Sequence, residues 1–209
     1  MTGVLDSVVS GTRIVPVLTV PRPETAAPAA DALAAGGARC AEVTFRTPDA
    51  ERVLKVMAAH GGPAVGAGTV LTVEQAERAV AAGARFVVSP GFDGEAVRTC
   101  ARAGVPVVPG VGTATELMRA LRAGLDTVKL FRAEPLGGAA LLRAPAAPFP
   151  QARFVPTGGI APRTAPGHLA IPAVLAVGGS WMSTAGHLDR GDYDGTRRLT
   201  ARAVERSTG

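Results

Sequence analysis

The chain has 209 residues, of which 47% are hydrophobic and 19% charged, and its formal net charge is +5. This composition excludes a disordered chain or a coiled coil, and no apolar run approaches the roughly 20 residues of a membrane-spanning helix. The first residues lack the basic and apolar segments of a signal peptide, so we expect a cytoplasmic protein. The length and the absence of a linker favour one domain over residues 1–209.

A positive net charge is one signature of nucleic-acid binding. Here, however, the arginines occur singly and aromatic residues make up only 4% of the chain, so surfaces for base stacking are missing. We therefore expect neither a nucleic acid nor a membrane as a partner. Cys40, Cys100 and the three histidines do not have the spacing of a metal site, so we expect no metal, and both cysteines are predicted to fill the core.

Short β-branched runs alternate with alanine-rich helical stretches along the whole chain. After a short helix over residues 3–10, the predicted strands cover residues 13–20, 39–45, 64–69, 85–89, 105–109, 127–131, 152–157 and 173–177. The predicted helices cover residues 24–35, 49–59, 73–82, 95–103, 113–123, 138–142, 162–169 and 193–205. Ala-Gly pairs mark left-handed helix stops at Gly36, Gly83, Gly104 and Gly124. Eight strand–helix units predict a parallel (β/α)8 barrel, with a doubly wound open sheet as the alternative.

In such a barrel the substrate site lies at the carboxyl ends of the strands. On the second strand, alternation places Cys40, Glu42, Thr44 and Arg46 on one face and apolar residues on the other. The apolar face suits packing against helices, so we expect the polar face to point toward the barrel axis. The same alternation points Lys129 of the sixth strand inward.

Lys129 is one of only two lysines among 22 basic residues. Burial and a cationic neighbour such as Arg46 disfavour a charged ammonium, and a neutral lysine attacks a carbonyl carbon to form a Schiff base. Glu42 is then a candidate for moving protons, and Arg46 for binding a substrate carboxylate. The alternative is a buried Lys–Glu pair that only stabilises the barrel.

Two glycine-rich turns, at residues 157–160 and 178–181, follow the last two strands. Turns at these places often bind phosphate through backbone N–H groups, although each is also compatible with plain turn geometry. Together, the strand-end residues predict a class I aldolase acting on a phosphorylated 2-keto acid. The alternative is a phosphate-binding barrel isomerase or epimerase that works by proton transfer without an imine.

These motifs resemble the 2-keto-3-deoxy-6-phosphogluconate (KDPG) and 4-hydroxy-2-oxoglutarate (KHG) aldolase family. The resemblance covers nearly the whole chain, in order, at residues 16–18, 36–37, 42–47, 66–70, 89–91, 109–113, 129–131, 156–160 and 178–181. The segment 178–181, Gly-Gly-Ser-Trp, resembles the phosphogluconate branch more than the phosphogalactonate branch, which is the alternative. Arg132 stands where the family usually has proline, and it either adds an anion contact or alters the loop.

The resemblance implies a (β/α)8 (TIM) barrel, usually a homotrimer, that works without metal or cofactor in the Entner–Doudoroff pathway. It implies reversible cleavage of KDPG to pyruvate and D-glyceraldehyde 3-phosphate, and in many members cleavage of KHG to pyruvate and glyoxylate. The implied catalytic residues are Lys129, the Schiff-base lysine, and Glu42, the acid–base group. The implied substrate-binding residues are Arg46, Gly68 and Thr69 for the carboxylate, Pro90 and Phe131 for the pyruvate moiety, and Thr157, Gly158, Gly159, Gly179 and Ser180 for the phosphate.

Overall fold

The computed structural model describes residues 6–7, 9–146 and 148–208. Its strands are β1 (Ile14–Leu18), β2 (Cys40–Thr44), β3 (Ala64–Gly68), β4 (Val87–Val88), β5 (Val107–Val108), β6 (Gly110–Val111), β7 (Thr127–Phe131), β8 (Arg153–Thr157) and β9 (Val177–Gly179). Its helices are η1 (Pro23–Thr25), α2 (Ala26–Ala35), α3 (Ala50–His60), α4 (Val73–Ala81), α5 (Gly94–Arg102), α6 (Ala114–Arg122), α7 (Ala133–Leu136), α8 (Gly138–Ala146), α9 (Ala165–Leu169), α10 (Ala185–Asp189) and α11 (Tyr193–Thr208). Part of the expected helix over residues 3–10 lies outside the described residues.

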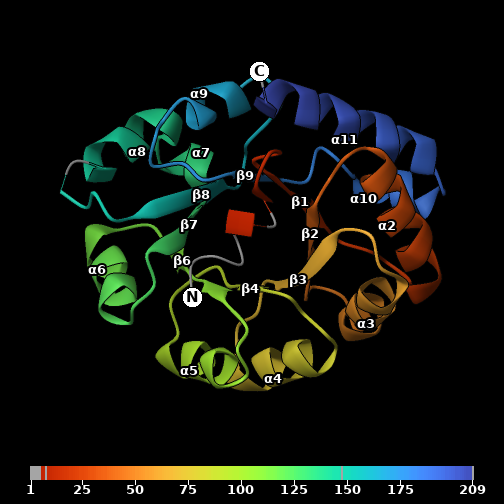
Figure 1. Ribbon diagram of the computed structural model, residues 1–209, viewed down its shortest axis with the longest axis horizontal. Helices are drawn as coiled ribbons and strands as arrows, with labels where there is room; N and C mark the ends of the chain where they lie inside the picture. The colour runs from red at the N-terminus through yellow and green to blue at the C-terminus, as the bar shows by residue number, and fades with distance from the viewer. Residues whose placement is uncertain (1–5, 8, 147, 209) are drawn as a thin grey trace.

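All strand pairs are parallel, in the order β5-β4-β3-β2-β1-β9-β8-β7-β6, and the helices surround the sheet (Figure 1). The fifth strand position is split at Pro109: β5 pairs with β4, whereas β6 pairs with β7. Proline has no N–H to donate, but its carbonyl still accepts a hydrogen bond from the Lys129 N–H, at 2.8 Å. The sheet therefore runs round a nearly closed barrel, which confirms the predicted fold class over the open sheet.

The two faces of the sheet pack into separate hydrophobic clusters. Ala41 and Val43 of β2 pack outward in a cluster with residues of α2 and α3, whereas Cys40 packs with Val15 and Phe86 inside the barrel. The alternation predicted for the second strand is thus correct. Val9, which precedes β1, packs in the inner cluster near the amino ends of the strands. The carboxyl ends are left for polar groups.

Local signals set the ends of several helices. Thr113 begins α6 with a capping box: its hydroxyl accepts a hydrogen bond from the Glu116 N–H, and the Glu116 carboxylate accepts one from the Thr113 N–H. The predicted left-handed stops are correct at Gly83, Gly104 and Gly124. The prediction at Gly36 is wrong, because φ is −81° there and Gly37 takes the left-handed conformation instead.

Gly36 has a packing role of its own. A Cβ placed on Gly36 would lie 2.6 Å from Cβ of Thr200 in α11, so glycine allows α2 and α11 to approach closely. This contact joins the first and last helices of the ring, which lie side by side in Figure 1.

The largest difference from the predicted elements concerns the last strand. We expected residues 173–177, but β9 covers Val177–Gly179 and pairs Ile14 with Val177 and Pro16 with Gly179. The preceding apolar run makes one isolated bridge, between Phe154 and Val174. The structure also adds α7 and α10, the predicted helix over residues 24–35 begins with the short 3-10 helix η1, and α8 continues beyond the expected 138–142. Apolar content located this strand but could not fix its register, which pairing with β1 determines.

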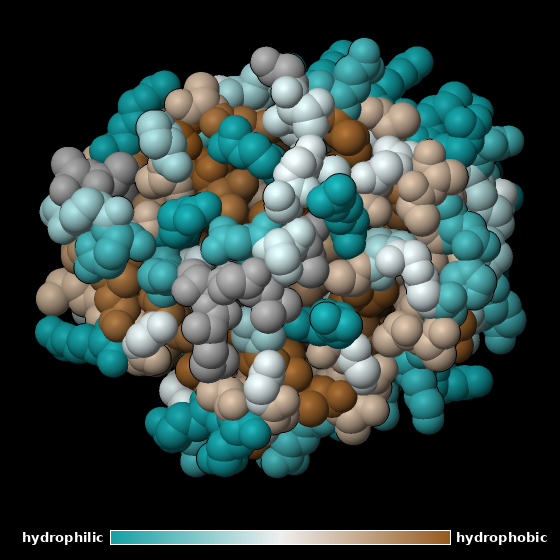
Figure 2. Space-filling view, viewed as in Figure 1, coloured by the Kyte–Doolittle hydropathy of each residue, from teal (hydrophilic) through white to brown (hydrophobic). Residues whose placement is uncertain are grey.

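The surface view is consistent with the scattered charge of the sequence. On the face shown in Figure 2, hydrophilic side chains are spread around the molecule and are not gathered into one patch. Within the described ranges, no helix combines the length and the apolar character needed to cross a membrane.

Candidate active site

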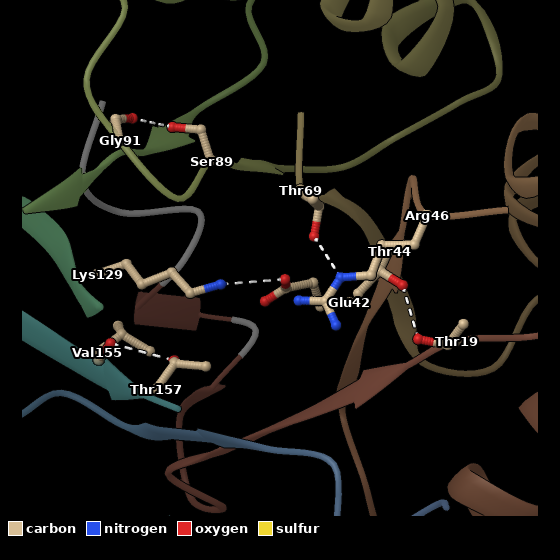
Figure 3. Close-up of polar contacts among 10 residues, drawn as sticks. All are labelled: Thr19, Glu42, Thr44, Arg46, Thr69, Ser89, Gly91, Lys129, Val155 and Thr157. Carbon is tan, nitrogen blue, oxygen red and sulfur yellow. Dashed lines mark hydrogen bonds and ion pairs between the residues drawn. The ribbon is translucent and has the colours of Figure 1, made fainter. Parts of the chain in front are cut away.

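Lys129 and Glu42 meet inside the barrel although they come from β7 and β2. Lys129 Nζ lies 3.3 Å from Glu42 Oε1, and the two side chains point toward each other (Figure 3). Both residues are buried, with 4% and 2% of their surface exposed. Two charges removed from water in this way stabilise each other only when they are paired. The structure thus brings together a buried amine and a carboxylate that can exchange protons with it or with a bound molecule.

The backbone of β3 holds the Glu42 carboxylate in place. A Cβ placed on Gly68 would lie 2.1 Å from Glu42 Oε1, so the carboxylate rests directly on a glycine of the neighbouring strand. Inside the same barrel, burial and the negative charge of Glu42 raise the pKa of the Cys40 thiol to about 12. Cys40 therefore stays a neutral thiol at physiological pH, and the only anion beside Lys129 among the described contacts is Glu42.

Arg46 and Thr69 form a polar pair just beyond these strand ends. The Arg46 Nε–H donates a hydrogen bond of 3.3 Å to Thr69 Oγ1, and the guanidinium is exposed (Figure 3). Thr69 has a φ of 58°, a left-handed conformation that is uncommon for a residue with a branched side chain. Such strain is typical of functional sites, where the surrounding structure imposes it. The pair is suited to binding a carboxylate at the opening of the site.

A cavity of about 360 Å³ opens next to Lys129. The predicted site residues that line it are Arg46, Lys129, Phe131, Thr157, Gly158, Gly159, Gly179 and Ser180. The ring centroid of Phe131 lies 5.1 Å from Lys129 Nζ, which places an aromatic wall beside the amine. The volume suits a small organic ligand. Its walls thus combine one amine, one guanidinium and two glycine turns, a set that suits an anionic carbonyl compound.

The glycine turn after β8 needs glycine at both positions. Gly158 and Gly159 have φ values of 99° and 83°, which side-chain-bearing residues rarely adopt. A Cβ on Gly159 would also lie 2.7 Å from Glu134 Cβ. The turn exposes its backbone to the cavity on one side and packs against residues 132–134 on the other. Contact with residues 132–134 therefore fixes the conformation of the turn.

Four predicted residues, Glu42, Gly68, Thr69 and Pro90, lie outside the lining of this cavity. Gly68 and Thr69 reach the site through Glu42 and Arg46, as described above. Pro90 lines a neighbouring hollow of about 240 Å³ together with Val70 and Phe92. The role predicted for Pro90 in the pyruvate pocket therefore stays a prediction, without a place in the lining of the Lys129 cavity.

Sequence reasoning missed several residues that the structure places at the site. Thr19 lines the cavity and shares a hydrogen bond of 2.9 Å with Thr44 (Figure 3). It stands directly after β1, at the carboxyl end of the strand, where site residues are expected. The sequence analysis missed it because the predicted strand extended to residue 20. Ser183 and Thr184 also line the cavity, but they follow the glycine turn with no local signal.

The fold, this buried pair inside the barrel and the cavity beside Lys129 define an α/β-barrel enzyme with a small-molecule site. Comparison with known proteins then specifies the family. Residues 5–199 match the family described as KDPG and KHG aldolase, and the chain belongs to that family.

Its relatives match over nearly their full length. A 2-dehydro-3-deoxy-phosphogluconate aldolase of Treponema pallidum is 48% identical over 92% of each chain. The KHG/KDPG aldolase of Escherichia coli K12 is 42% identical over 96% of this chain and 94% of its own. The crystal structure of KDPG aldolase from Legionella pneumophila, with pyruvate captured as a covalent carbinolamine, is 36% identical with a TM-score of 0.91 and covers 95% of this chain and 97% of its own.

Proposed function

We propose that this protein is a class I aldolase that reversibly cleaves KDPG to pyruvate and D-glyceraldehyde 3-phosphate. The observation that carries the proposal is the buried Lys129–Glu42 pair, at 3.3 Å, whose lysine lines a cavity with glycine turns on its wall. The names of its relatives in the family support the same reaction, and they also support cleavage of KHG to pyruvate and glyoxylate.

In the proposed reaction, neutral Lys129 Nζ attacks the C2 carbonyl carbon of the substrate. A protonated Glu42 passes its proton to the hydroxyl of the resulting carbinolamine, which leaves as water and gives an iminium ion beside the Glu42 carboxylate. The C3–C4 bond then breaks, its electron pair moves to the iminium to form an enamine, and the C4 hydroxyl proton passes to the Glu42 carboxylate. The C4 fragment leaves as the aldehyde. Protonation of the enamine at C3 and addition of water to the imine release pyruvate and restore the lysine.

The site residues divide the substrate between them in this proposal. Arg46 binds the carboxylate with Thr69 and the Gly68 backbone, while Phe131 and Pro90 border the pyruvate moiety. The phosphate lies at the two glycine turns, where the proposed contacts are Thr157, Gly158, Gly159, Gly179 and Ser180. Backbone N–H groups suit this task because they bind an anion without adding a further cation to a cavity that Lys129 and Arg46 already line.

A homotrimeric assembly, which the family resemblance implies, and a cytoplasmic location, which is expected from the sequence, are part of the proposal. Light scattering coupled to gel filtration measures the assembly, with a mass of three chains as the expected result.

The decisive experiment is borohydride reduction in the presence of pyruvate, followed by peptide mass spectrometry. The expected result is one reduced pyruvyl adduct on Lys129. The chain offers a matched control, because its other lysine, Lys55, is exposed on α3. Lys129→Ala should abolish the adduct and turnover, whereas Lys55→Ala should preserve both. Folded protein that forms no adduct on Lys129 would refute the aldolase and favour a phosphate-binding isomerase.

A further inference from the structure

A buried histidine lies behind the glycine turn, outside the cavity lining described above. His168 of α9 is 1% exposed, and its Nε2 lies 2.8 Å from Oε1 of Glu134 in α7. These residues are 34 positions apart, so the contact joins the segment that follows the Lys129 strand to the helix that follows β8.

Glu134 also holds the glycine turn through its backbone. The Glu134 N–H donates a hydrogen bond of 3.0 Å to the Gly158 carbonyl. In a trans peptide the carbonyl and the following N–H point in opposite directions, so this bond turns the Gly159 N–H away from Glu134. Since Gly158 and Gly159 line the cavity, the orientation of this peptide group decides whether a bound anion finds a donor there.

We propose that Glu134 and His168 are positioning residues that set the orientation of the Gly158–Gly159 peptide for binding the substrate phosphate. This inference rests on the proposed function, in particular on the placing of the phosphate at this turn. Neither side chain is proposed to touch the substrate. His168 fixes the Glu134 side chain, Glu134 fixes the peptide plane, and the peptide presents its N–H to the anion.

The surroundings of His168 explain how one contact can hold the ring. Its Nδ1 is buried and has no hydrogen-bond partner among the described residues. An ionised carboxylate can only accept a hydrogen bond, so the contact with Glu134 places a ring hydrogen on Nε2. That N–H donates to the Glu134 carboxylate. The hydrogen bond from His168 lowers the pKa of Glu134 most. Burial opposes this effect, and the Thr164 hydroxyl and the charges of His168 and Arg163 add to it, so Glu134 is an anion at neutral pH.

The packing leaves little freedom for the turn to find another position. Glu134 Cβ would lie 2.7 Å from a Cβ on Gly159, and Arg132 Cα would lie 3.2 Å from a Cβ on Gly158. The segment 132–134 therefore packs directly against the turn. This segment continues directly from β7, the strand that carries Lys129. One short stretch of chain therefore sets the distance from the amine to the proposed phosphate site.

The test compares two variants of similar size. His168→Gln keeps an amide N–H near the place of Nε2, whereas His168→Asn is one methylene shorter and cannot reach Glu134. Steady-state kinetics are measured with KDPG and with 2-keto-3-deoxygluconate, the same acid without its phosphate. The Asn variant should raise KM for KDPG about tenfold, the scale of a lost hydrogen bond to a charged group, and leave kcat within about twofold. The KM and kcat for the unphosphorylated acid should not change. The Gln variant should have a KM for KDPG close to that of the parent protein.

A purely structural role predicts a different pattern, in which both substrates lose activity together or neither does; either result would overturn the inference. If the Asn variant does not fold by circular dichroism, Glu134→Gln and Glu134→Ala give the same comparison, since the amide oxygen of Gln still accepts from His168. Ser180→Ala separates this inference from the proposed function. A raised KM for KDPG in Ser180→Ala with no effect in His168→Asn refutes only the positioning role. No effect in either variant, with the Lys129 adduct intact, refutes the phosphate placement itself.

Discussion

Gly68→Ala should move the Glu42 carboxylate without changing any group that reacts. The added Cβ would lie 2.4 Å from Glu42 Cγ and 2.5 Å from Cδ, whereas ordinary contact begins near 3.4 Å. Glu42 must therefore move by about 1 Å, since the Cβ is fixed to the strand that pairs Gly68 with Thr44. A displacement of this size at a reacting group costs about 10²-fold in rate, so kcat for KDPG should fall about 100-fold.

The assay pairs turnover with adduct formation. Pyruvate production from KDPG, measured through lactate dehydrogenase, gives kcat, and borohydride trapping gives the fraction of Lys129 that forms the imine. We expect trapping to continue, because the lysine is unchanged, while turnover falls. Thermal unfolding should show a loss of about 1–3 kcal/mol from overpacking.

A matched control is Gly91→Ala in the loop that follows β4. No atom lies within 4 Å of the Cβ that this substitution adds, so kcat should stay near that of the parent protein. If Gly68→Ala keeps kcat within threefold of the parent, the reasoning that Glu42 acts from a fixed position against Gly68 is wrong.

Three further predictions follow from the described contacts. Glu42→Gln should lower kcat by about 10²–10⁴-fold and still form the adduct, as measured by the two assays above; a variant as active as the parent would show that Glu42 does not transfer the proton. Glu116→Ala should cost about 1 kcal/mol of stability in urea unfolding at pH 7. The N–H groups of Gly112 and Thr113 lower the pKa of Glu116, so its contribution is present above the ordinary glutamate range and is lost as the pH falls through the lowered pKa. The difference between parent and variant should therefore shrink at pH 3.5, and a constant difference would contradict this account. Finally, Cys40, whose pKa is raised to about 12, should not react with a thiol reagent at pH 8 until the protein unfolds, and rapid labelling of native Cys40 would contradict its burial.

The sequence predicted the fold through periodicity and the site through strand ends. β7 covers the predicted residues 127–131, because alternation on this strand is clear and Asp126 ends the preceding turn. β9 was displaced because the strand signal lies in the apolar run that precedes it, whereas β9 itself is Val-Gly-Gly, and only pairing with β1 shows that these glycines form the ladder. Lys129 and Glu42 were recognisable as polar groups on inward faces. Their separation of 3.3 Å was not, because it depends on how the two strands face each other across the barrel.

Contacts between helices were beyond sequence reasoning. Glu134 and His168 lie 34 residues apart on elements that carry no shared motif, and one of those elements, α7, was not predicted at all. The resemblance to a family supplied a list of residues for the substrate, but the structure alone separates those that line the Lys129 cavity from Pro90, which lines a neighbouring hollow.

The closing of the barrel has a consequence for how the protein is made. Glu42 is available early in synthesis and Lys129 later, but the cavity also needs the turn at Gly179, and β9 enters the sheet only by pairing with β1. The first and last strands lie more than 150 residues apart, so this pairing has a high loop-closure cost and comes late in folding. A growing chain on the ribosome therefore holds its reactive lysine for some time without a finished pocket around it. Chemistry begins only when the final quarter of the polypeptide has emerged and the ring has closed.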